Sequence, residues 1–290
     1  MLTFIPPLLP TAVESPPDGD GWIHEIKQDG YRTLFARDGK MVRAYTRQGN
    51  DWSSRYLSIT PAILELNCSS AMIDGEVIVQ DEQGRADFAA LQRDIHRNPE
   101  NLVFIAFDLL ELDGADLRSA PVEDRRRRLM YLVGKPSSVL AFSDSVVGNG
   151  AALFEAAKRM ELEGVVSKKL GSRYVSGRSR TWVKAKAFVL DTFEVIGVAR
   201  TPGEAPSAML AKNGLYAGRA FINLPAPLRE AFWSYVDSHS TQEAAVDADV
   251  GNATWMLPGL QAQVKHLSGS GKLRHASLRG ISVQRKAGPR

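Results

Sequence analysis

Short apolar or alternating stretches, interrupted by helical segments in no regular order, constrain the fold of this chain most strongly. In the first two thirds, strands are predicted at Trp22–Ile26, Thr33–Arg37, Met41–Tyr45, Met72–Val79 and Leu102–Leu110. Helices are predicted near Phe88–Ile95, Val122–Leu132 and Gly150–Glu161. Because strands and helices do not alternate regularly, the pattern predicts an α+β domain rather than a Rossmann-type parallel sheet.

The composition changes after Lys186, where a second region of short strands begins. Strands are predicted at Thr192–Ala199, Gly214–Ile222 and Ala262–His266, with one helix at Leu228–Ser238. About 100 residues of short strands with one inserted helix are typical of a small β-barrel such as the OB-fold. We therefore expect two domains, residues 1–188 and residues 189–290.

Charge and composition narrow the class of protein. The chain has 36 Lys and Arg against 33 Asp and Glu, and its C-terminal segment from Lys265 onward carries cations but no acid. Such a segment fits either a polyanionic partner or a solvated tail. The longest apolar run, Leu102–Phe107, is too short to span a membrane, and the single Cys68 excludes a disulfide framework. We expect a cytoplasmic protein with no membrane association.

A run of four arginines, Arg125–Arg128, falls on the predicted helix at Val122–Leu132, beside Glu123 and Asp124. Mixed charges at helical spacing favour a solvated helix face over a DNA contact. We therefore expect this run to be exposed.

The segment Glu25-Ile-Lys27-Gln-Asp-Gly30-Tyr-Arg32 contains a candidate nucleophile. A lysine amine attacks only when it is neutral, and its free pKa is about 10.4. Burial and neighbouring cations lower that pKa, and Arg32 supplies such a charge together with a fork that suits phosphate. Taken alone, the segment is more typical of a surface lysine beside an Asp-Gly turn.

Further elements follow downstream in a fixed order. Asp74 and Glu76 lie inside an apolar strand, where carboxylates are costly unless a metal or a cation pairs with them. Phe107 ends a strand segment that can present its ring to a base. Lys184 and Lys186 alternate on one strand and so share a face, which suits adjacent phosphates.

In this order the motifs resemble those of the covalent nucleotidyltransferase superfamily, which comprises ATP-dependent DNA ligases, RNA ligases and mRNA capping enzymes. The motif series also includes the segments at Thr46–Trp52, Phe104–Asp108 and Glu163–Val166. The Pro16-Pro-Asp-Gly-Asp-Gly-Trp22 lead into Lys27 and the Asp87-Phe-Ala-Ala-Leu-Gln92 stretch resemble most closely the ligase module of bacterial end-joining ligases. The resemblance covers essentially the whole chain. It implies a nucleotidyltransferase (adenylation) domain followed by an OB-fold domain.

The resemblance also implies roles for individual residues. Lys27 is expected to attack the α-phosphorus of ATP and to form a lysyl-AMP intermediate, with Mg²⁺ or Mn²⁺ as the metal. Glu25 would accept a hydrogen bond from the adenine amino group. The remaining roles are ribose and phosphate contacts for Arg32 and Arg47, ribose and metal binding for Glu76, metal binding for Glu163, adenine stacking for Phe107 with Val165 or Val166 on the other face, and phosphate contacts for Arg178, Lys184 and Lys186.

The C-terminal segment Lys272–Ile281 resembles the end of the family's OB domain, but the chain then departs from the family pattern. The usual Arg, Asp and Lys of the last motif align with Ser282, Gln284 and Arg285. Because that motif orients the pyrophosphate, we expect weaker self-adenylation unless Arg285 and Lys286 substitute for it.

The function expected from this resemblance is an ATP-dependent DNA ligase. It would seal nicks between a 5′-phosphate and a 3′-hydroxyl in duplex DNA, as a monomer in DNA repair or end joining at the bacterial nucleoid. End joining would add a partner protein that binds DNA ends. Two alternatives stay open: an RNA ligase or capping-type enzyme, and a catalytically weakened relic that binds nucleic acid.

Overall fold

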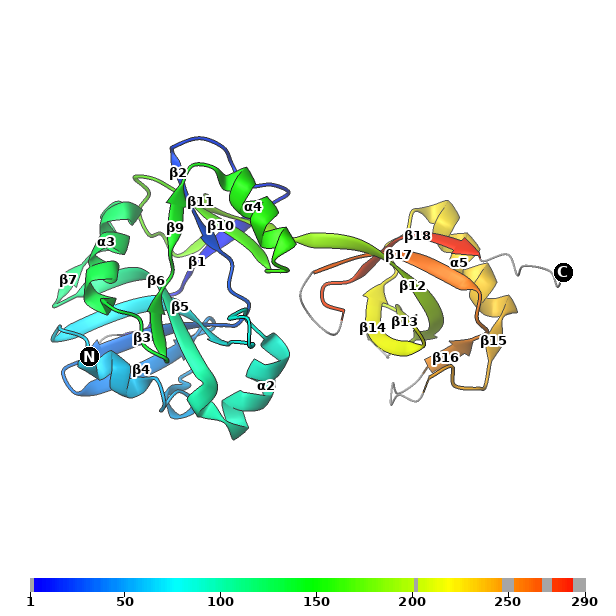
Figure 1. The fold of residues 1–290 in the computed structure, drawn as a ribbon, viewed down its shortest axis with the longest axis horizontal. Coiled ribbons are helices and arrows are strands. Elements are labelled where there is room, and N and C mark those ends of the chain that lie inside the picture. Colours follow the sequence, from blue (N-terminus) through cyan, green and yellow to red (C-terminus); the bar gives the residue numbers. More distant parts are fainter. Residues whose placement is uncertain (1–2, 201–202, 247–252, 268–272, 284–290) are drawn as a thin grey trace. The chain divides into compact units, whose positions relative to one another are not determined.

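A computed structural model of the chain describes residues 3–200, 203–246, 253–267 and 273–283 (Figure 1). The chain divides into two compact units, Met1–Ala187 and Phe188–Arg290, each of which is described by itself. In these described segments, no helix is both long and apolar enough to cross a membrane.

The first unit is built on two sheets. One has the order β1 (Leu8–Val13), β11 (Gly177–Lys186), β10 (Gly164–Lys169), β2 (Trp22–Ile26) and β9 (Ser145–Val147). The other has the order β4 (Met41–Thr46), β3 (Tyr31–Asp38), β5 (Ser70–Val79), β6 (Leu102–Leu112) and β7 (Ala115–Asp116), with β8 (Leu140–Phe142) also paired to β6. We call them the five-stranded and the six-stranded sheet. All five strands predicted for this unit from alternation are present.

Short helical segments complete this unit: η1 (Ser53–Arg55), α1 (Thr60–Glu65), α2 (Phe88–Arg97), η2 (Pro99–Asn101), α3 (Val122–Val133) and α4 (Gly150–Arg159). The three predicted helices correspond to α2, α3 and α4. The Asp87 side chain caps α2 by accepting a hydrogen bond from the Ala90 amide at 2.9 Å, which satisfies one of the free amides of the first turn. The residue that precedes α2 in the sequence therefore stabilises the start of this helix.

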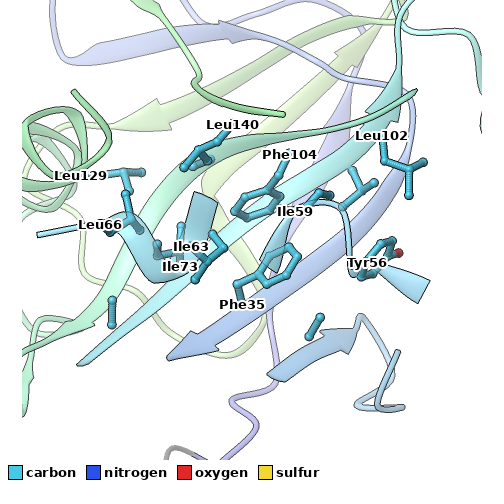
Figure 2. Close-up of a cluster of buried hydrophobic side chains, with 14 of the residues drawn as sticks. Phe35, Tyr56, Ile59, Ile63, Leu66, Ile73, Leu102, Phe104, Leu129 and Leu140 are labelled. Atoms are coloured by element: carbon cyan, nitrogen blue, oxygen red, sulfur yellow. The ribbon is translucent and has the colours of Figure 1, made fainter. Parts of the chain in front are cut away.

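The two largest apolar clusters of the first unit involve the six-stranded sheet. The larger lies on one face of the six-stranded sheet, where Phe35 and Phe104 meet with ring centroids 4.6 Å apart and Ile59 and Ile63 pack nearby (Figure 2). The second cluster joins the two sheets: it includes Leu34, Ala36 and Met72 from the six-stranded sheet, and Leu8, Ile23 and Trp182 from the five-stranded sheet. The two sheets therefore face each other across an apolar contact.

Part of the Arg125–Arg128 run is buried, which corrects the expected solvated helix face. Arg125 and its partner Asp108 are 0% exposed, and their side chains are paired through two hydrogen bonds of 2.8 Å. Arg126 is also buried, whereas Arg127 is exposed and pairs with Asp124 on its own helix. The prediction was wrong because the charge pattern does not reveal carboxylates that come from other strands.

The second unit is a closed barrel. Its strands follow the order β12 (Phe188–Ala199), β13 (Ser207–Lys212), β14 (Leu215–Phe221), β18 (Ser277–Val283) and β17 (Leu260–Leu267), and β17 pairs back to β12. Helix α5 (Ala226–Ser238) packs Phe232 and Val236 into the barrel core. The short strands β15 (Ser240–Thr241) and β16 (Ala253–Met256) extend the sheet beyond β12.

The strands and the helix expected in the second unit are present, and β13, β15, β16 and β18 are additional. Of the residues aligned with the altered last motif, Ser282 lies in β18. Gln284, Arg285 and Lys286 lie outside the described residues, so the expectation for them stays a prediction.

The buried pair between Arg125 and Asp108 gives a stability prediction. Replacing Asp108 by Ala leaves the Arg125 charge buried without its partner, so the free energy of unfolding should fall by about 3–5 kcal/mol. Urea denaturation followed by tryptophan fluorescence measures this change. Asp124→Ala removes an exposed partner of Arg127 on the same helix and should cost about 1 kcal/mol at most. Equal losses in the two variants would contradict the prediction.

Candidate active site

A cavity of about 560 Å³ lies between the two sheets of the first unit. The side chains that line it include Glu25, Val166, Lys168, Trp182 and Lys184 from the five-stranded sheet. The six-stranded sheet contributes Arg32, Glu76 and Phe107. The strands that pack apolar residues between the sheets thus present polar residues further along the same faces.

Strand register explains the five-stranded wall. Val166 on β10 pairs with Glu25 on β2 and with Lys184 on β11, so these three side chains share a face. Lys168 and Trp182, two residues further along their strands, lie on the same face. A single alternation pattern therefore builds this wall.

Val165 does not line the cavity, which corrects the position given in the sequence analysis. It pairs with Ile26 and Ala185 on the opposite face of the sheet, and it is 0% exposed in a cluster with Phe154 and Ala157. Val166 faces the cavity instead, because neighbouring residues of a strand point to opposite faces. The alternative residue of the pair is therefore the one available for contact with a ligand.

A β-bulge positions Phe107 in the other wall. On β6, Ala106 pairs with Gly75 and Asp108 pairs with Asp74, so Phe107 has no partner on β5. Bulges of this kind redirect a side chain and are frequent beside active sites. The Phe107 ring lines the cavity, where the ring centroid is 4.8 Å from Lys168 Nζ and 5.3 Å from Arg32 Cζ.

Lys27 follows directly after β2 and lies in an ion-pair network. Its amide donates to the Gly164 carbonyl at 2.9 Å, and its Nζ is 2.5 Å from Glu163 Oε2. The other oxygen of Glu163 is 3.2 Å from Lys186 Nζ. The side chains of Lys27 and Lys186 are each 19% exposed, so one carboxylate holds two partly accessible amines.

The turn after Lys27 depends on glycine at position 30. A Cβ there would lie 2.2 Å from the Val77 carbonyl oxygen, a distance that no side chain tolerates. Gly30 thus allows the turn to pack directly on β5, which brings the residues on either side of it to the cavity.

Arg32 lines the cavity, but its guanidinium is already bound by protein groups. It forms a bidentate pair with Asp74 at 3.0 and 2.6 Å and donates to the Leu8 carbonyl at 2.7 Å. The Tyr174 hydroxyl donates to the same Asp74 carboxylate at 2.6 Å. This pairing explains how Asp74 is tolerated inside an apolar strand, and it makes Arg32 first of all a link between strands.

Positive charge gathers around Lys27. Burial, together with the charges of Lys27 and Lys186, lowers the pKa of Lys184 below its usual value. Arg47 and Arg178 are exposed and line the same cavity. We call Lys27, Arg47, Lys184 and Lys186 the basic cluster. Several cations gathered in one place suit a polyanionic ligand such as a triphosphate.

A second group, here called the Glu25 pocket, consists of Glu25, Phe107, Ser143 and Lys168. Glu25 is 3% exposed, accepts from the Ser143 hydroxyl at 2.8 Å, and lies 2.5 Å from Lys168 Nζ. Burial lowers the pKa of Lys168 to about 8, although Glu25 opposes that shift. A carboxylate acceptor beside an aromatic ring can bind a flat ligand that carries a hydrogen-bond donor.

Sequence reasoning missed Lys168 and Ser143. Lys168 follows Val166 by two residues on β10, so strict alternation from Val166 identifies its face. Ser143 follows the short strand β8, and no local pattern marks it. The first omission was avoidable, whereas the second depends on tertiary structure.

The carboxylates near Lys27 can contribute to a metal site only in part. Among the described residues, no group of three or more His, Cys, Asp or Glu side chains is arranged to hold an ion. Glu76 and Glu163 both lie close enough to Lys27 to influence it electrostatically, and Glu163 raises the pKa of Glu76. Mg²⁺ commonly uses one or two carboxylates together with substrate phosphates, so this oxygen donor set fits that ion once a nucleotide is present.

The environment of Glu76 leads to a titration prediction. Burial raises the pKa of Glu76 to about 7, while Lys27 and Arg32 lower it and Glu163 raises it. Lys27→Ala should therefore move the midpoint above 7, and Glu163→Gln should move it below 7. Carboxyl ¹³C NMR of glutamate-labelled protein, assigned with Glu76→Gln, measures the midpoint. A wild-type midpoint near 4.5 would refute this assignment.

Comparison of the chain with known proteins identifies a family of similar sequences and structures. The model of the ATP-dependent DNA ligase domain family matches residues 11–186, which include all residues that line the cavity except Leu9 and Pro10. The multifunctional non-homologous end joining protein LigD of Pseudomonas aeruginosa is 37% identical over 219 residues, which are 75% of this chain and 26% of that protein. The LigD of Mycobacterium tuberculosis (strain H37Rv) is 31% identical over 284 residues, 91% of this chain and 36% of that protein.

Solved structures agree with this placement. A mycobacterial DNA ligase D complexed with ATP and MES has a TM-score of 0.60 at 29% identity, covering 97% of this chain and 95% of that one. The ligase domain of M. tuberculosis LigD has a TM-score of 0.59 at 28% identity, covering 95% of this chain and 94% of that one.

The nucleotidyltransferase fold of this chain thus matches the fold of the LigD ligase domain. The chain spans between 26% and 36% of the length of the two curated relatives above. With a family model that matches more than half of its residues and relatives above 30% identity, the chain belongs to the ATP-dependent DNA ligase domain family.

Proposed function

We propose that this chain is an ATP-dependent DNA ligase that seals nicks between a 5′-phosphate and a 3′-hydroxyl in duplex DNA. The observation that carries the proposal is the position of Lys27. Its amine pairs with Glu163, and it lines the cavity together with Arg47, Lys184 and the Glu25 pocket. A nucleophile, a site for phosphates and a site for a base are the parts that self-adenylation requires.

In the first step, Lys27 Nζ attacks the α-phosphorus of ATP. The N–P bond forms as the bond from the α-phosphorus to the bridging oxygen breaks, and pyrophosphate leaves. Glu163 is 2.5 Å from Lys27 Nζ and is suited to accept the proton that the amine loses. Lys184 and Lys186 would neutralise the phosphates. AMP would then pass to the 5′-phosphate of the nick, and the 3′-hydroxyl would displace it.

The adenine would occupy the Glu25 pocket. Phe107 and Val166 would contact the two faces of the base, and Glu25 would accept a hydrogen bond from its amino group. Glu76 would bind the ribose, while Arg47 and Arg178 would contact phosphates of the nucleotide or of the nick. Arg32, held by Asp74, would mainly position the wall that carries Glu76, with which it is paired in register.

Mg²⁺ or Mn²⁺ would be held by Glu76 and Glu163 together with the phosphates of bound ATP. When bound, the ion supplies positive charge to the phosphates. Glu76 must be ionised to serve as a ligand, so its raised pKa of about 7 implies that metal affinity increases as the pH rises through that value.

The second unit would serve as an OB-fold domain, with the boundary between domains near residues 188 and 189. Numbered within the barrel, its strands follow the closed order 1-2-3-5-4-1, and α5 comes between the third and fourth of them, as in OB-folds. Such a domain would contact the DNA backbone without sequence preference, and added salt would weaken that contact.

The cellular role would be DNA repair by end joining. The support is similarity to LigD proteins that are named for non-homologous end joining. A monomer that acts on nicked duplex DNA at the bacterial nucleoid, with a DNA-end-binding protein as partner, is the simplest arrangement. The chain covers 94% of the M. tuberculosis LigD ligase domain but only 36% of that whole protein, so the other activities of these longer proteins are not assigned to this chain.

The primary test is covalent labelling. Wild-type protein incubated with α-labelled ATP and Mg²⁺ should retain label on a denaturing gel, whereas Lys27→Ala should retain none because it lacks the nucleophile. Lys169→Ala is the matched control, since Lys169 is an exposed lysine of β10 that does not line the cavity. Labelling of Lys27→Ala at the wild-type level would refute the proposed nucleophile.

A second test examines the acceptor. Adding nicked duplex DNA with a 5′-phosphate should discharge the labelled enzyme and produce a sealed strand. A duplex whose nicked strand is RNA should be sealed at least about tenfold more slowly, if the enzyme selects DNA geometry at the nick. Faster sealing of the RNA strand would favour an RNA ligase. If wild type fails to label itself but seals a pre-adenylated nick, only the first step is impaired.

A further inference from the structure

Arg126 is buried behind the Glu25 pocket and contacts three of its parts. Its Nη1 is 2.8 Å from Glu25 Oε1 and donates to the Phe107 carbonyl at 3.2 Å. Its Nη2 donates to the Ser143 carbonyl at 2.6 Å. A single guanidinium from α3 therefore joins β2, β6 and the segment that follows β8.

The Arg126 side chain does not line the cavity itself. It is 5% exposed and its guanidinium lies over the Phe142 ring, with Cζ 4.6 Å from the ring centroid. Because its donors point to three separate backbone or side-chain acceptors, a shift of this residue would move Glu25 and Phe107 together. The Phe142 ring and these hydrogen bonds leave Arg126 little freedom to shift.

The charges of the pocket also depend on Arg126. Glu25 is nearly inaccessible to water, and its neighbours are two cations, Lys168 and Arg126, and one hydroxyl donor, Ser143. All three neighbours are donors, so the Glu25 carboxylate serves as a hydrogen-bond acceptor in this pocket. A purine with an amino group at position 6 offers a donor to this acceptor, whereas a purine with a carbonyl oxygen there offers a second acceptor.

We propose that Arg126 is a positioning residue for nucleotide selection, which pairs with the Glu25 carboxylate and holds it in line with Phe107. The cavity thereby prefers ATP over nucleotides that carry a 6-oxo group. This inference rests on the proposed binding of adenine in the Glu25 pocket, and it assigns that selection to a residue that does not touch the ligand.

Arg125 provides a matched control on the same helix. It is equally buried and equally engaged, but its partners are Asp108 and the carbonyl groups of Ala120 and Ser172. None of these residues lines the cavity. Substitutions at Arg125 should therefore reproduce the loss of stability caused by substitutions at Arg126, without the change in nucleotide preference.

The experiment measures equilibrium binding of ATP and of ITP, whose base carries a 6-oxo group, to the full chain by calorimetry without divalent metal. We expect Arg126→Met to lower the preference for ATP over ITP by about tenfold, since a hydrogen bond to a charged group is lost from its proper alignment. Arg125→Met should keep the wild-type preference. Thermal melting of each variant reports whether it is folded.

A milder pair covers the case in which a methionine variant does not fold. Arg126→Lys keeps a charge beside Glu25 but cannot reach the Phe107 and Ser143 carbonyls together, so its ATP preference should fall by about threefold. Arg125→Lys should leave the preference unchanged. If the lysine variants at both positions show the wild-type preference, Arg126 is only a structural residue and the inference is overturned.

The outcome is separable from that of the labelling test. If wild type binds ATP more tightly than ITP and Arg126→Lys loses that preference, the inference holds even where no lysyl-AMP forms. If wild type forms lysyl-AMP but binds ATP and ITP equally well, the inference fails while the proposed activity stands.

Discussion

The burial of charge between two facing sheets is the constraint on which the rest of the first unit depends. Ionised groups removed from water require partners, and the structure supplies them across strands: Arg32 with Asp74, Arg125 with Asp108, and Glu25 with Lys168 and Arg126. Each pair joins two different elements of the unit. Two of these cations also donate to a carbonyl group of the opposite sheet, Arg32 to Leu8 and Lys168 to Phe107, and so link the two walls of the cavity.

Within that frame, the cavity divides into two electrostatic environments. Around Lys27, the cations outnumber the carboxylates, and Glu163 holds two amines at once. Around Glu25, the charges are buried against aromatic rings and are fixed by hydrogen bonds. A ligand that binds both must be anionic at one part and flat at the other. A nucleoside triphosphate has this shape, and this is why the site is interpreted through ATP rather than through a general anion.

Much of this arrangement follows from local sequence. Alternation located the strands that carry Glu25, Glu76, Lys184 and Lys186, and the family resemblance on those motifs identified the cavity before its walls were known. Alternation applied to Glu163–Val166 would also have separated Val165 from Val166. What sequence could not supply is the identity of partners across strands: no local pattern tells whether an arginine in a helix pairs with a carboxylate elsewhere, so Arg125 and Arg126 were assigned to solvent.

The bulge in β6 has a consequence for the backbone as well as for the Phe107 ring. Since Phe107 has no partner on β5, its carbonyl accepts instead from Lys168 at 3.0 Å and from Arg126 at 3.2 Å, the same two cations that flank Glu25. The one extra residue thus frees a backbone carbonyl from strand pairing, and that carbonyl accepts hydrogen bonds from two cations. The extra residue also shifts the alternation of side chains by one position. As a result, Phe104 and Ala106 before the bulge and Leu109 after it point into the same core. In a regular strand, Leu109 would point to the opposite face. Deleting or inserting one residue at this bulge would therefore turn side chains that now line the cavity toward the core, and core side chains toward the cavity.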